Sequence, residues 1–462
     1  MLIRHGTLVL PTGLGVSDLR ITGERIAAIG IGLEPRAGEE IWDASGCIVL
    51  PGLVDPHLHI QLDTGLYRTA DDWFIGTRSA ACGGFTTVID FATQFPGQTL
   101  RQAVENRHAE VAGRACLDYG LHCMVTDLPA GREAMLADLV ELGCPSAKVY
   151  TTYRPNYYQD DDQLLRLFRA AVDAGILVMV HAENDALVAA ATRRLVDEGK
   201  TGWAYHGQAR PALAEAEAVQ RVLFLAREAG CALYIVHCTT GLAVEMIRAA
   251  QTAGQYASAE TCPQYLLLDE RCYAGPHPEW YILQPPLRAP HERERLWQLL
   301  HMGTIATLGT DHCDYTLAQK TASPRFAETP GGLPGLETAL PLMVTYGVEE
   351  GRLTWPQLVR LMSTNPARLF GLYPRKGALQ PGSDADVVIY DPAGEGTITV
   401  SNLRGVSGYT PYEGMAVAGR VRTTISRGRV VYNEGEFLGE AGWGRFVRGQ
   451  RFVYENFIQQ WG

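Results

Sequence analysis

The middle of the chain alternates short apolar runs with helix-like segments, and this alternation constrains the fold more than any other feature. Eight runs end in polar or charged residues: IVLPGLVDPHLH, FTTVIDFA, YGLHCMVTD, SAKVYTTY, ILVMVHAEN, LYIVHCT, YASAETCP and TIATLGTDH. Segments rich in Ala, Leu, Glu and Arg, such as DDQLLRLFRAAVDAG, separate most of them. Eight strands with intervening helices predict a (β/α)8 barrel. A doubly wound sheet also alternates, but it commonly carries a Gly-rich phosphate loop, and no GxGxxG is present.

The two ends of the chain share a different texture. Both contain short clusters of β-forming residues between Gly and Pro, such as LIRHGTLVL near the start and SDADVVIYDP near the end. We therefore predict one discontinuous β domain, built from residues 1–49 and 377–438, around a barrel over residues 50–376. Residues 439–462 are aromatic and partly basic, and we expect them to form a tail at a subunit interface.

Charge and composition exclude several classes of partner. The 40 basic and 51 acidic residues give a net charge of −11, which argues against nucleic acid or an anionic membrane as the main partner. No apolar run approaches the ~18 residues of a membrane span, and the first residues are too interrupted for a signal peptide. The ten cysteines form no CxxC pair, so reduced thiols and a cytoplasmic location are expected.

Metal-binding residue types stand at the carboxyl ends of five of the predicted strands. In a barrel these ends converge on one face, so the six side chains are expected to meet there: His57, His59, Lys148, His181, His237 and Asp311. A His-x-His pair on a strand places both imidazoles on the same side. Imidazole and carboxylate ligands suit borderline divalent metals such as Zn²⁺.

Lys148 is the residue that points to two metals rather than one. As an ammonium group it would repel a dicationic centre. Carboxylation of its side-chain nitrogen by CO₂ would convert the cation into a carbamate anion that can bridge two metals. We therefore predict N6-carboxylysine at position 148 and a binuclear centre.

Ten segments make the chain similar to the hydantoinase and dihydropyrimidinase branch of the amidohydrolase superfamily. They keep the family's order from residue ~47 to ~415: PGLVDPHLH, SAKVYTTY, VHAEND, YIVHCT, ETCPQYLLLDE, GTDHC, PGGLPGLET, NPARLFGLYPRKG, PGSDADVVIYDP and YTPYEG. The resemblance, which is strongest to D-hydantoinases, implies a distorted (β/α)8 barrel with a β-sandwich from both termini. It also implies two zinc or other divalent ions, with His57, His59 and Asp311 on the first, His181 and His237 on the second, and carbamylated Lys148 between them.

The same resemblance implies a hydrolytic mechanism. A hydroxide shared by two zinc ions would open a cyclic ureide, either a hydantoin or a dihydropyrimidine, to an N-carbamoyl amino acid. Asp311 would move the proton from the nucleophile to the leaving nitrogen. The hydroxyl of Tyr153 would donate to the developing oxyanion.

The substrate-binding segments depart from the family pattern at two positions. Gln284 stands where relatives usually have Ser, and Gly331 stands where they usually have Asn. In relatives, both positions contact the cyclic amide mainly through main-chain groups. Binding of the substrate ring is therefore expected to persist despite the changed side chains. An apolar pocket for a ring substituent is predicted from the loop residues Leu66, Tyr67, Phe95, Tyr157 and Tyr158.

Two alternatives to a hydantoinase or dihydropyrimidinase remain open from the sequence. An allantoinase or a cyclic imide hydrolase would use the same mechanism, and the departures at Gln284 and Gly331 keep that reading open. A non-catalytic scaffold protein is the other reading, although all six expected ligands are present. The expected partner is a small cyclic amide, and a homo-oligomer, dimer or tetramer, is expected from the resemblance.

Overall fold

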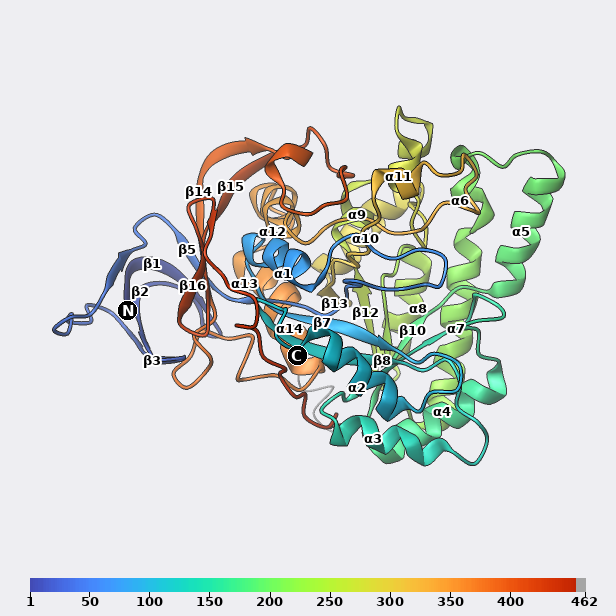
Figure 1. Cartoon of the computed structure of the whole chain (residues 1–462), viewed down its shortest axis with the longest axis horizontal. Coiled ribbons are helices and arrows are strands. Elements are labelled where there is room, and N and C mark those ends of the chain that lie inside the picture. The colour runs from blue at the N-terminus through green and yellow to red at the C-terminus, as the bar shows by residue number, and fades with distance from the viewer. Residues whose placement is uncertain (454–462) are drawn as a thin grey trace.

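Eight parallel strands form one sheet in chain order from β6 to β13 in the computed structural model, which describes residues 1–453 (Figure 1). The strands are β6 (Leu53–Asp55), β7 (Phe85–Thr93), β8 (Asp118–Met124), β9 (Ser146–Tyr150), β10 (Leu177–His181), β11 (Leu233–Ile235), β12 (Ala257–Thr261) and β13 (Ile305–Leu308). A bridge between Leu58 and His312 links the segments that follow β6 and β13, so the sheet nearly closes. The predicted distorted (β/α)8 barrel is confirmed.

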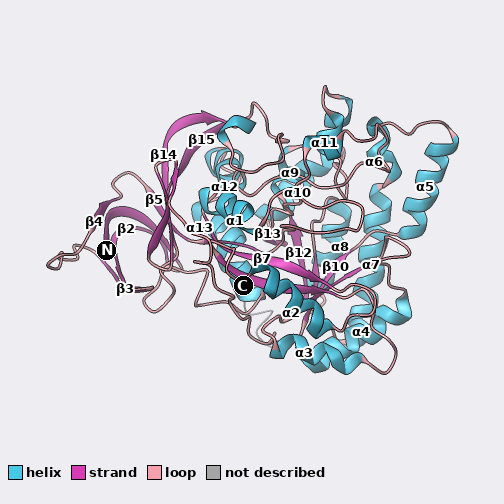
Figure 2. Ribbon diagram, viewed as in Figure 1, coloured by secondary structure: helices cyan, strands magenta, loops and turns pink. Residues whose placement is uncertain are grey.

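Helices surround this barrel (Figure 2). They are α1 (Trp73–Cys82), α2 (Leu100–Val111), α3 (Leu136–Glu141), α4 (Asp161–Ala174), α5 (Asp185–Asp197), α6 (His206–Ala209), α7 (Ala212–Ala229), α8 (Gly241–Thr252), α9 (Pro263–Leu267), α10 (Pro290–His301), α11 (Leu317–Lys320), α12 (Ala339–Met343), α13 (Trp355–Val359) and α14 (Asn365–Leu369). Helix α4 shows why such segments fold: Leu164, Leu167 and Phe168 form one buried stripe. It begins at the capping residue Asp160 and ends at the left-handed Gly175.

Strands from both ends of the chain form a second sheet, of nine strands, at one end of the molecule (Figure 2). They are β1 (Leu2–Leu10), β2 (Gly13–Thr22), β3 (Arg25–Gly30), β4 (Ile41–Asp43), β5 (Ile48–Pro51), β14 (Val387–Thr397), β15 (Ala416–Ser426), β16 (Arg429–Asn433) and β17 (Glu436–Phe437). Strand β5 lies between β14 and β1, which joins the two ends of the chain. A separate core containing Ile3, Leu19 and Ile389 lies on this sheet, so the expected terminal β-structure is confirmed.

A buried ion cluster joins the terminal sheet to the barrel. Lys376 Nζ lies 2.6 Å from Asp118 Oδ2 on β8 and 2.7 Å from Asp386 Oδ2 beside β14. Arg427, which follows β15, donates from Nε to Asp118 Oδ1 at 3.0 Å. All four side chains are buried, so removing one partner would leave an uncompensated charge in the interior.

The described part of the C-terminal segment, residues 439–453, lies along the barrel of its own chain. Its main chain bonds to that of Tyr119 on β8, to Gly143 before β9 and to Gly175 before β10. Residues 454–462 of the predicted tail lie outside the described residues, and a role at a subunit interface stays a prediction. Among residues 1–453, no helix is long and apolar enough to cross a membrane.

Candidate metal centre and active site

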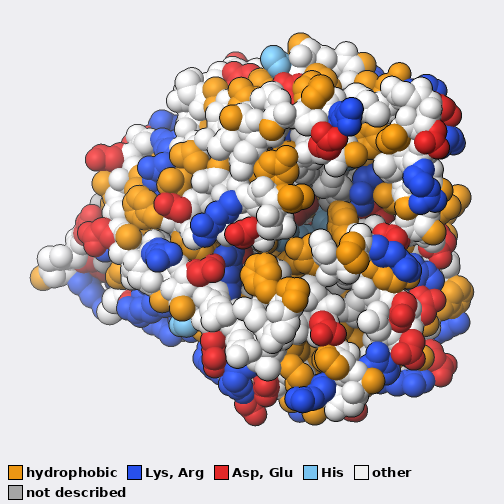
Figure 3. Space-filling view, turned by 45° about the vertical axis from the view of Figure 1, so that its right-hand side comes forward, with side chains coloured by type: hydrophobic (Ala, Val, Ile, Leu, Met, Phe, Trp, Pro, Cys, Tyr) orange, Lys and Arg blue, Asp and Glu red, His pale blue; other side chains and the backbone are white. Residues whose placement is uncertain are grey.

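A cavity of about 750 Å³ opens at the carboxyl ends of the barrel strands. Figure 3 shows the molecular surface from the side on which a hollow opens between apolar side chains. Five of the six predicted ligands line the cavity: His59, Lys148, His181, His237 and Asp311. The sixth, His57, is fully buried and contacts two of them. The structure therefore brings all six side chains together, as the strand-end pattern predicts.

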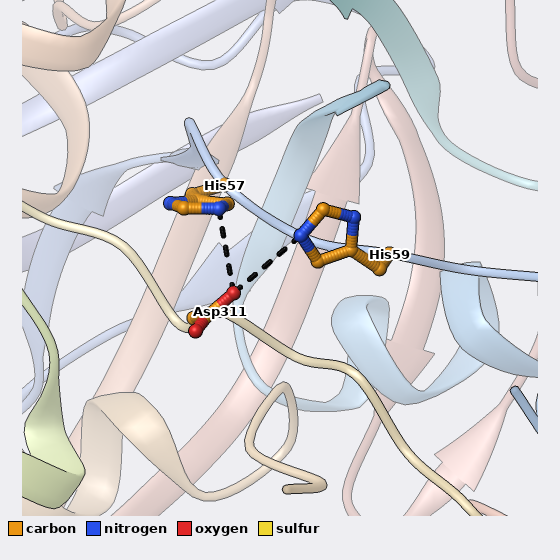
Figure 4. Close-up of side chains that lie close together, drawn as sticks. All are labelled: His57, His59 and Asp311. Atoms are coloured by element: carbon orange, nitrogen blue, oxygen red, sulfur yellow. Dashed lines mark ion pairs between the residues drawn. The ribbon is translucent and has the colours of Figure 1, made fainter. Parts of the chain in front are cut away.

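His57, His59 and Asp311 form a compact group of potential ligands (Figure 4). Asp311 Oδ1 lies 3.3 Å from His57 Nε2 and 3.6 Å from His59 Nε2. Donor atoms that lie about 2.0–2.2 Å from one tetrahedral ion stand roughly 3.3–3.6 Å apart. The two distances from Asp311 Oδ1 therefore fit donors to a single metal ion, and all three donor atoms lie within 4.8 Å of one another.

His181 and His237 provide the second pair of imidazoles, with ring centres 4.6 Å apart. His181 Nε2 lies 2.7 Å from Glu183 Oε2 and donates to it when Nδ1 carries the lone pair. His237 Nδ1 is buried and has no hydrogen-bond partner within the described residues. Burial lowers the pKa of both rings and keeps them neutral, which is the form that binds metal.

Lys148 lies between the two groups of imidazoles. Its Nζ is 2.8 Å from His57 Nε2 and 4.3 Å from the ring centre of Phe91. No ion pair joins it to a carboxylate in the described part of the chain, and burial lowers its pKa to about 8. An ammonium group surrounded by imidazoles is unfavourable, whereas an anionic carbamate at this place would balance two metal charges.

Buried carboxylates that were not among the predicted site residues orient the imidazoles. Glu260 Oε1 accepts from His57 Nδ1 at 2.6 Å and from the main-chain N–H of His237 at 2.9 Å. Glu183 holds His181 and is itself bound by two guanidinium nitrogens of Arg210. Such carboxylate–histidine pairs set the ring orientation at metal sites. Both glutamates stand at predicted strand ends, in VHAEN and YASAET, which was the available signal.

Three site residues have backbone conformations that are rare for residues other than glycine. Tyr153, His237 and Asp311 have φ angles of 73°, 39° and 49°. Asp55 holds the end of strand β6 next to the Asp311 segment, because its carboxylate accepts from Thr310 Oγ1 at 2.6 Å. Strained backbone of this kind concentrates at functional sites, where the surrounding packing holds it in place.

Tyr153 and Asp311 carry the two predicted catalytic roles, and both line the cavity. The ring centre of Tyr153 is 5.1 Å from the ring centre of His181. The guanidinium carbon of Arg210 lies 5.2 Å from the ring centre of Tyr153. Burial raises the pKa of Tyr153, so the hydroxyl keeps its proton and can donate. Burial raises the pKa of Asp311 to about 8 in the absence of a bound cation.

Gln284 and Gly331 line the cavity on two neighbouring segments. A Cβ atom at Gly331 would stand 1.7 Å from Gln284 Oε1, so the Gln284 amide occupies the space of a side chain at 331. The Gln284 amide and a side chain at position 331 would therefore compete for the same space. Within residues 1–453 the main-chain N–H groups of both residues lack a partner, while the neighbouring carbonyls of Leu283 and Pro285 are bonded.

The predicted apolar pocket is only partly present. Leu66, Tyr67 and Tyr157 line the cavity. Phe95 does not line the cavity: it lies on the loop after β7, where 44% of its surface is exposed to solvent. Tyr158 also lies off the cavity wall, since its ring stacks under the guanidinium group of Arg154 at 3.7 Å. The structure therefore places the first three residues on the cavity wall and the last two off it.

Comparison with known proteins agrees with this geometry. Residues 48–431 match the model of the Amidohydrolase family. The chain is 41% identical over 457 residues to D-phenylhydantoinase from Escherichia coli strain K12, covering 98% of this chain and 99% of that protein. The dihydropyrimidinase from Brevibacillus agri NCHU1002 has a TM-score of 0.96 at 36% identity, and the D-hydantoinase from a Bacillus sp. AR9 has 0.95 at 38%; each match covers 98% of this chain and 99% of that one.

The chain therefore belongs to the amidohydrolase family and is a hydrolase of the hydantoinase and dihydropyrimidinase type. This similarity confirms the resemblance seen in the sequence. The fold, with its barrel and terminal sheet, is shared over nearly the whole chain.

Proposed function

We propose that the protein hydrolyses the amide bond of a cyclic ureide, a hydantoin or a dihydropyrimidine, to an N-carbamoyl amino acid. One observation carries this proposal. The potential metal ligands and the unpaired main-chain N–H groups of Gln284 and Gly331 line the same cavity. A small planar ring can therefore contact both the hydrolytic centre and a hydrogen-bonding wall.

The donor atoms fit two divalent metal ions, zinc or another. His57, His59 and Asp311 would hold one ion, and His181 and His237 the other. When bound, the ions would lower the pKa of a shared water and polarise the scissile carbonyl. Support comes from the 3.3 and 3.6 Å spacing around Asp311 Oδ1 and from the neutral, buried rings.

Lys148 would bridge the two ions as a carbamate. Its amine nitrogen would attack the carbon of CO₂ and release one proton, which forms an N–C bond and a carboxylate. The buried setting supports this reaction, because it lowers the pKa of Lys148 and so increases the fraction of neutral amine. The product anion would replace a cation that otherwise opposes metal binding.

Asp311 would act as the proton carrier. Its carboxylate would accept a proton from the attacking water and give it to the leaving nitrogen, because amide nitrogen leaves poorly without protonation. Tyr153 would donate from its hydroxyl to the oxygen on which negative charge develops. Its position beside His181, across the cavity from the Asp311 segment, supports this role.

The main-chain N–H groups of Gln284 and Gly331 would hold the ring by its edge. A cyclic ureide keeps its amide in the cis form, which an open-chain secondary amide reaches only at ~2.5–4 kcal/mol. A fixed pair of donors therefore favours rings over open chains. Leu66, Tyr67 and Tyr157 on the cavity wall favour a ring with an apolar substituent.

An allantoinase or cyclic imide hydrolase is the second candidate, since the same centre would serve it. The half-buried Gln284 amide has no hydrogen-bond partner in the part of the chain that the structure describes, so it offers a polar contact to such a ring. The apolar wall makes hydantoins the first choice. A scaffold role without catalysis is not favoured, because all six ligands meet at the cavity.

We also propose that the protein works in a reducing compartment and forms a homo-oligomer. All ten cysteines are free and nine are buried, which supports assignment to the cytoplasm. A dimer or tetramer is proposed from the family. Sedimentation analysis of the purified protein tests it, and a monomer at micromolar concentration would contradict it.

A substrate panel tests the proposed reaction directly. Zinc-loaded protein is assayed with phenylhydantoin, dihydrouracil, allantoin and succinimide, and kcat/KM is compared. We expect phenylhydantoin to be preferred. If allantoin is preferred by about tenfold or more, a difference of about 1.4 kcal/mol in transition-state binding, the second candidate replaces the first.

Two matched variants test the role of Asp311 in turnover. Asp311→Asn keeps the shape of the side chain but removes the proton carrier, so turnover should fall by at least ~10²–10⁴. Asp197→Asn, on the exposed end of α5, makes the same chemical change away from the cavity and should leave turnover intact. Equal activity of the two variants would exclude Asp311 from catalysis.

A further inference from the structure

A fully buried lysine outside the metal centre has no role in the mechanism described above. Lys320 ends the short helix α11, and its side chain is 0% exposed. No ion pair joins it to a carboxylate within the described residues. Burial lowers its pKa to about 7. Because burying an unpaired cation is unfavourable, such a residue calls for a specific explanation.

The hydrogen bonds of Lys320 supply that explanation. Its Nζ donates to the carbonyl of Ile282 at 2.7 Å and to the carbonyl of Pro330 at 2.9 Å. These carbonyls lie in the two segments that carry Gln284 and Gly331. Ammonium and neutral amine both have enough N–H groups for the two bonds. Lys320 therefore clamps the two ring-binding segments together in either charge state.

The bond to Pro330 has a second consequence. The Pro330 carbonyl and the Gly331 N–H belong to the same peptide unit. A hydrogen bond to the carbonyl of a peptide polarises it and strengthens its N–H as a donor. Lys320 thus acts on the group that is left free for the substrate.

His206 repeats this arrangement on the other segment. Its Nε2 donates to the carbonyl of Leu283 at 2.7 Å, and that carbonyl shares a peptide unit with the free N–H of Gln284. Burial lowers the pKa of His206 to about 3, so the ring is neutral and Nε2 carries the proton. The unpaired N–H groups of Gln284 and Gly331 thus each have a buried donor behind them.

We propose that Lys320 and His206 are positioning residues that align and polarise the Gly331 and Gln284 peptides for binding the ring of the substrate. This inference rests on the proposed function, because it places a cyclic amide against these two N–H groups. Neither side chain contacts the ring or the reacting atoms. Their effect is therefore expected on ring binding rather than on the metal centre.

Three variants of the zinc-loaded protein test the inference. Lys320→Met removes both hydrogen bonds and should raise KM for phenylhydantoin by about tenfold, as expected for the loss of a well-made hydrogen bond. Lys320→Arg keeps the donors and should restore most of the affinity. His206→Phe should raise KM similarly through the other peptide. Metal content and kcat should stay close to those of the unaltered chain.

Lys376→Met is the matched control, since Lys376 is another buried lysine but lies at the junction with the terminal sheet. It should lower thermal stability without raising KM. Unchanged KM in both Lys320→Met and His206→Phe would overturn the inference, as would an equal rise in Lys376→Met. If Lys320→Met does not fold, the KM values of His206→Phe and Lys320→Arg for phenylhydantoin test the inference instead. Failure of the unaltered chain to hydrolyse any cyclic amide would instead overturn the proposed function.

Discussion

Gly331→Ala is the perturbation whose outcome the structure specifies most closely. The new Cβ would stand 1.7 Å from Gln284 Oε1, 2.3 Å from Cδ and 2.5 Å from Nε2. Ordinary contact begins at about 3.4 Å, so the amide oxygen has to move by roughly 1.7 Å. The φ angle of Gly331 is outside the left-handed region, so backbone strain adds nothing.

The expected magnitude follows from what has to move. The Gln284 amide is the end of a flexible side chain without a hydrogen-bond partner in the described residues, so the free energy of unfolding should fall by only about 1 kcal/mol, the lower end for overpacking. Because Gln284 lines the cavity, the displaced amide is expected to swing into it. We therefore expect kcat/KM for phenylhydantoin to fall by about tenfold through a higher KM.

A double-mutant cycle gives the decisive measurement. Gln284→Ser removes the amide, so adding Gly331→Ala to it should cost almost nothing, and the coupling free energy should lie within the 0.5–3 kcal/mol found for residues in contact. Gly335→Ala is the control, because a Cβ there would meet its nearest atom at 3.7 Å. Additive effects of the two substitutions, or an equal loss in Gly335→Ala, would refute the steric argument.

Four further predictions concern the proposed metal centre and the junction with the terminal sheet. Tyr153→Phe should lower turnover by roughly 10²–10³ with KM little changed; a change in KM alone would make Tyr153 a packing residue. A chelator should abolish hydrolysis and Zn²⁺ should restore it; full activity after metal removal would contradict this. Lys148→Ala should bind less metal by elemental analysis, and an unchanged metal content would contradict the bridging role. Lys376→Met should lower the free energy of unfolding by about 3–5 kcal/mol in denaturant titrations, and a loss under 1 kcal/mol would show the ion cluster to be unimportant.

The barrel and the convergence of the six candidate ligands were predictable because they depend on local patterns. Successive side chains of a strand alternate between its faces, so His57 and His59 were expected on one side. Parallel barrel strands all end on the same face, so ligands far apart in the sequence were expected to converge. The structure bears this out for Lys148, His181 and Asp311.

The supporting residues could not be predicted in the same way. Glu260 reaches His57 because the sheet nearly closes, which leaves only β13 between β12 and β6, and this closure depends on the register of all the barrel strands. Lys320 looks like an ordinary helix lysine in the sequence, and only its burial against the Ile282 and Pro330 carbonyls gives it a role. Phe95 and Tyr158 show the converse, since these aromatic loop residues do not line the cavity.

By itself the sequence determined the barrel, the terminal sheet and the six potential ligands, because residue type and spacing along a strand decide which face a side chain takes. Only the tertiary structure decided that Gln284 fills the space above Gly331, and that the N–H groups of both residues stay unpaired. These relations depend on how two loops pack against each other. A loop has no repeating geometry, so its side-chain directions follow from packing rather than from spacing.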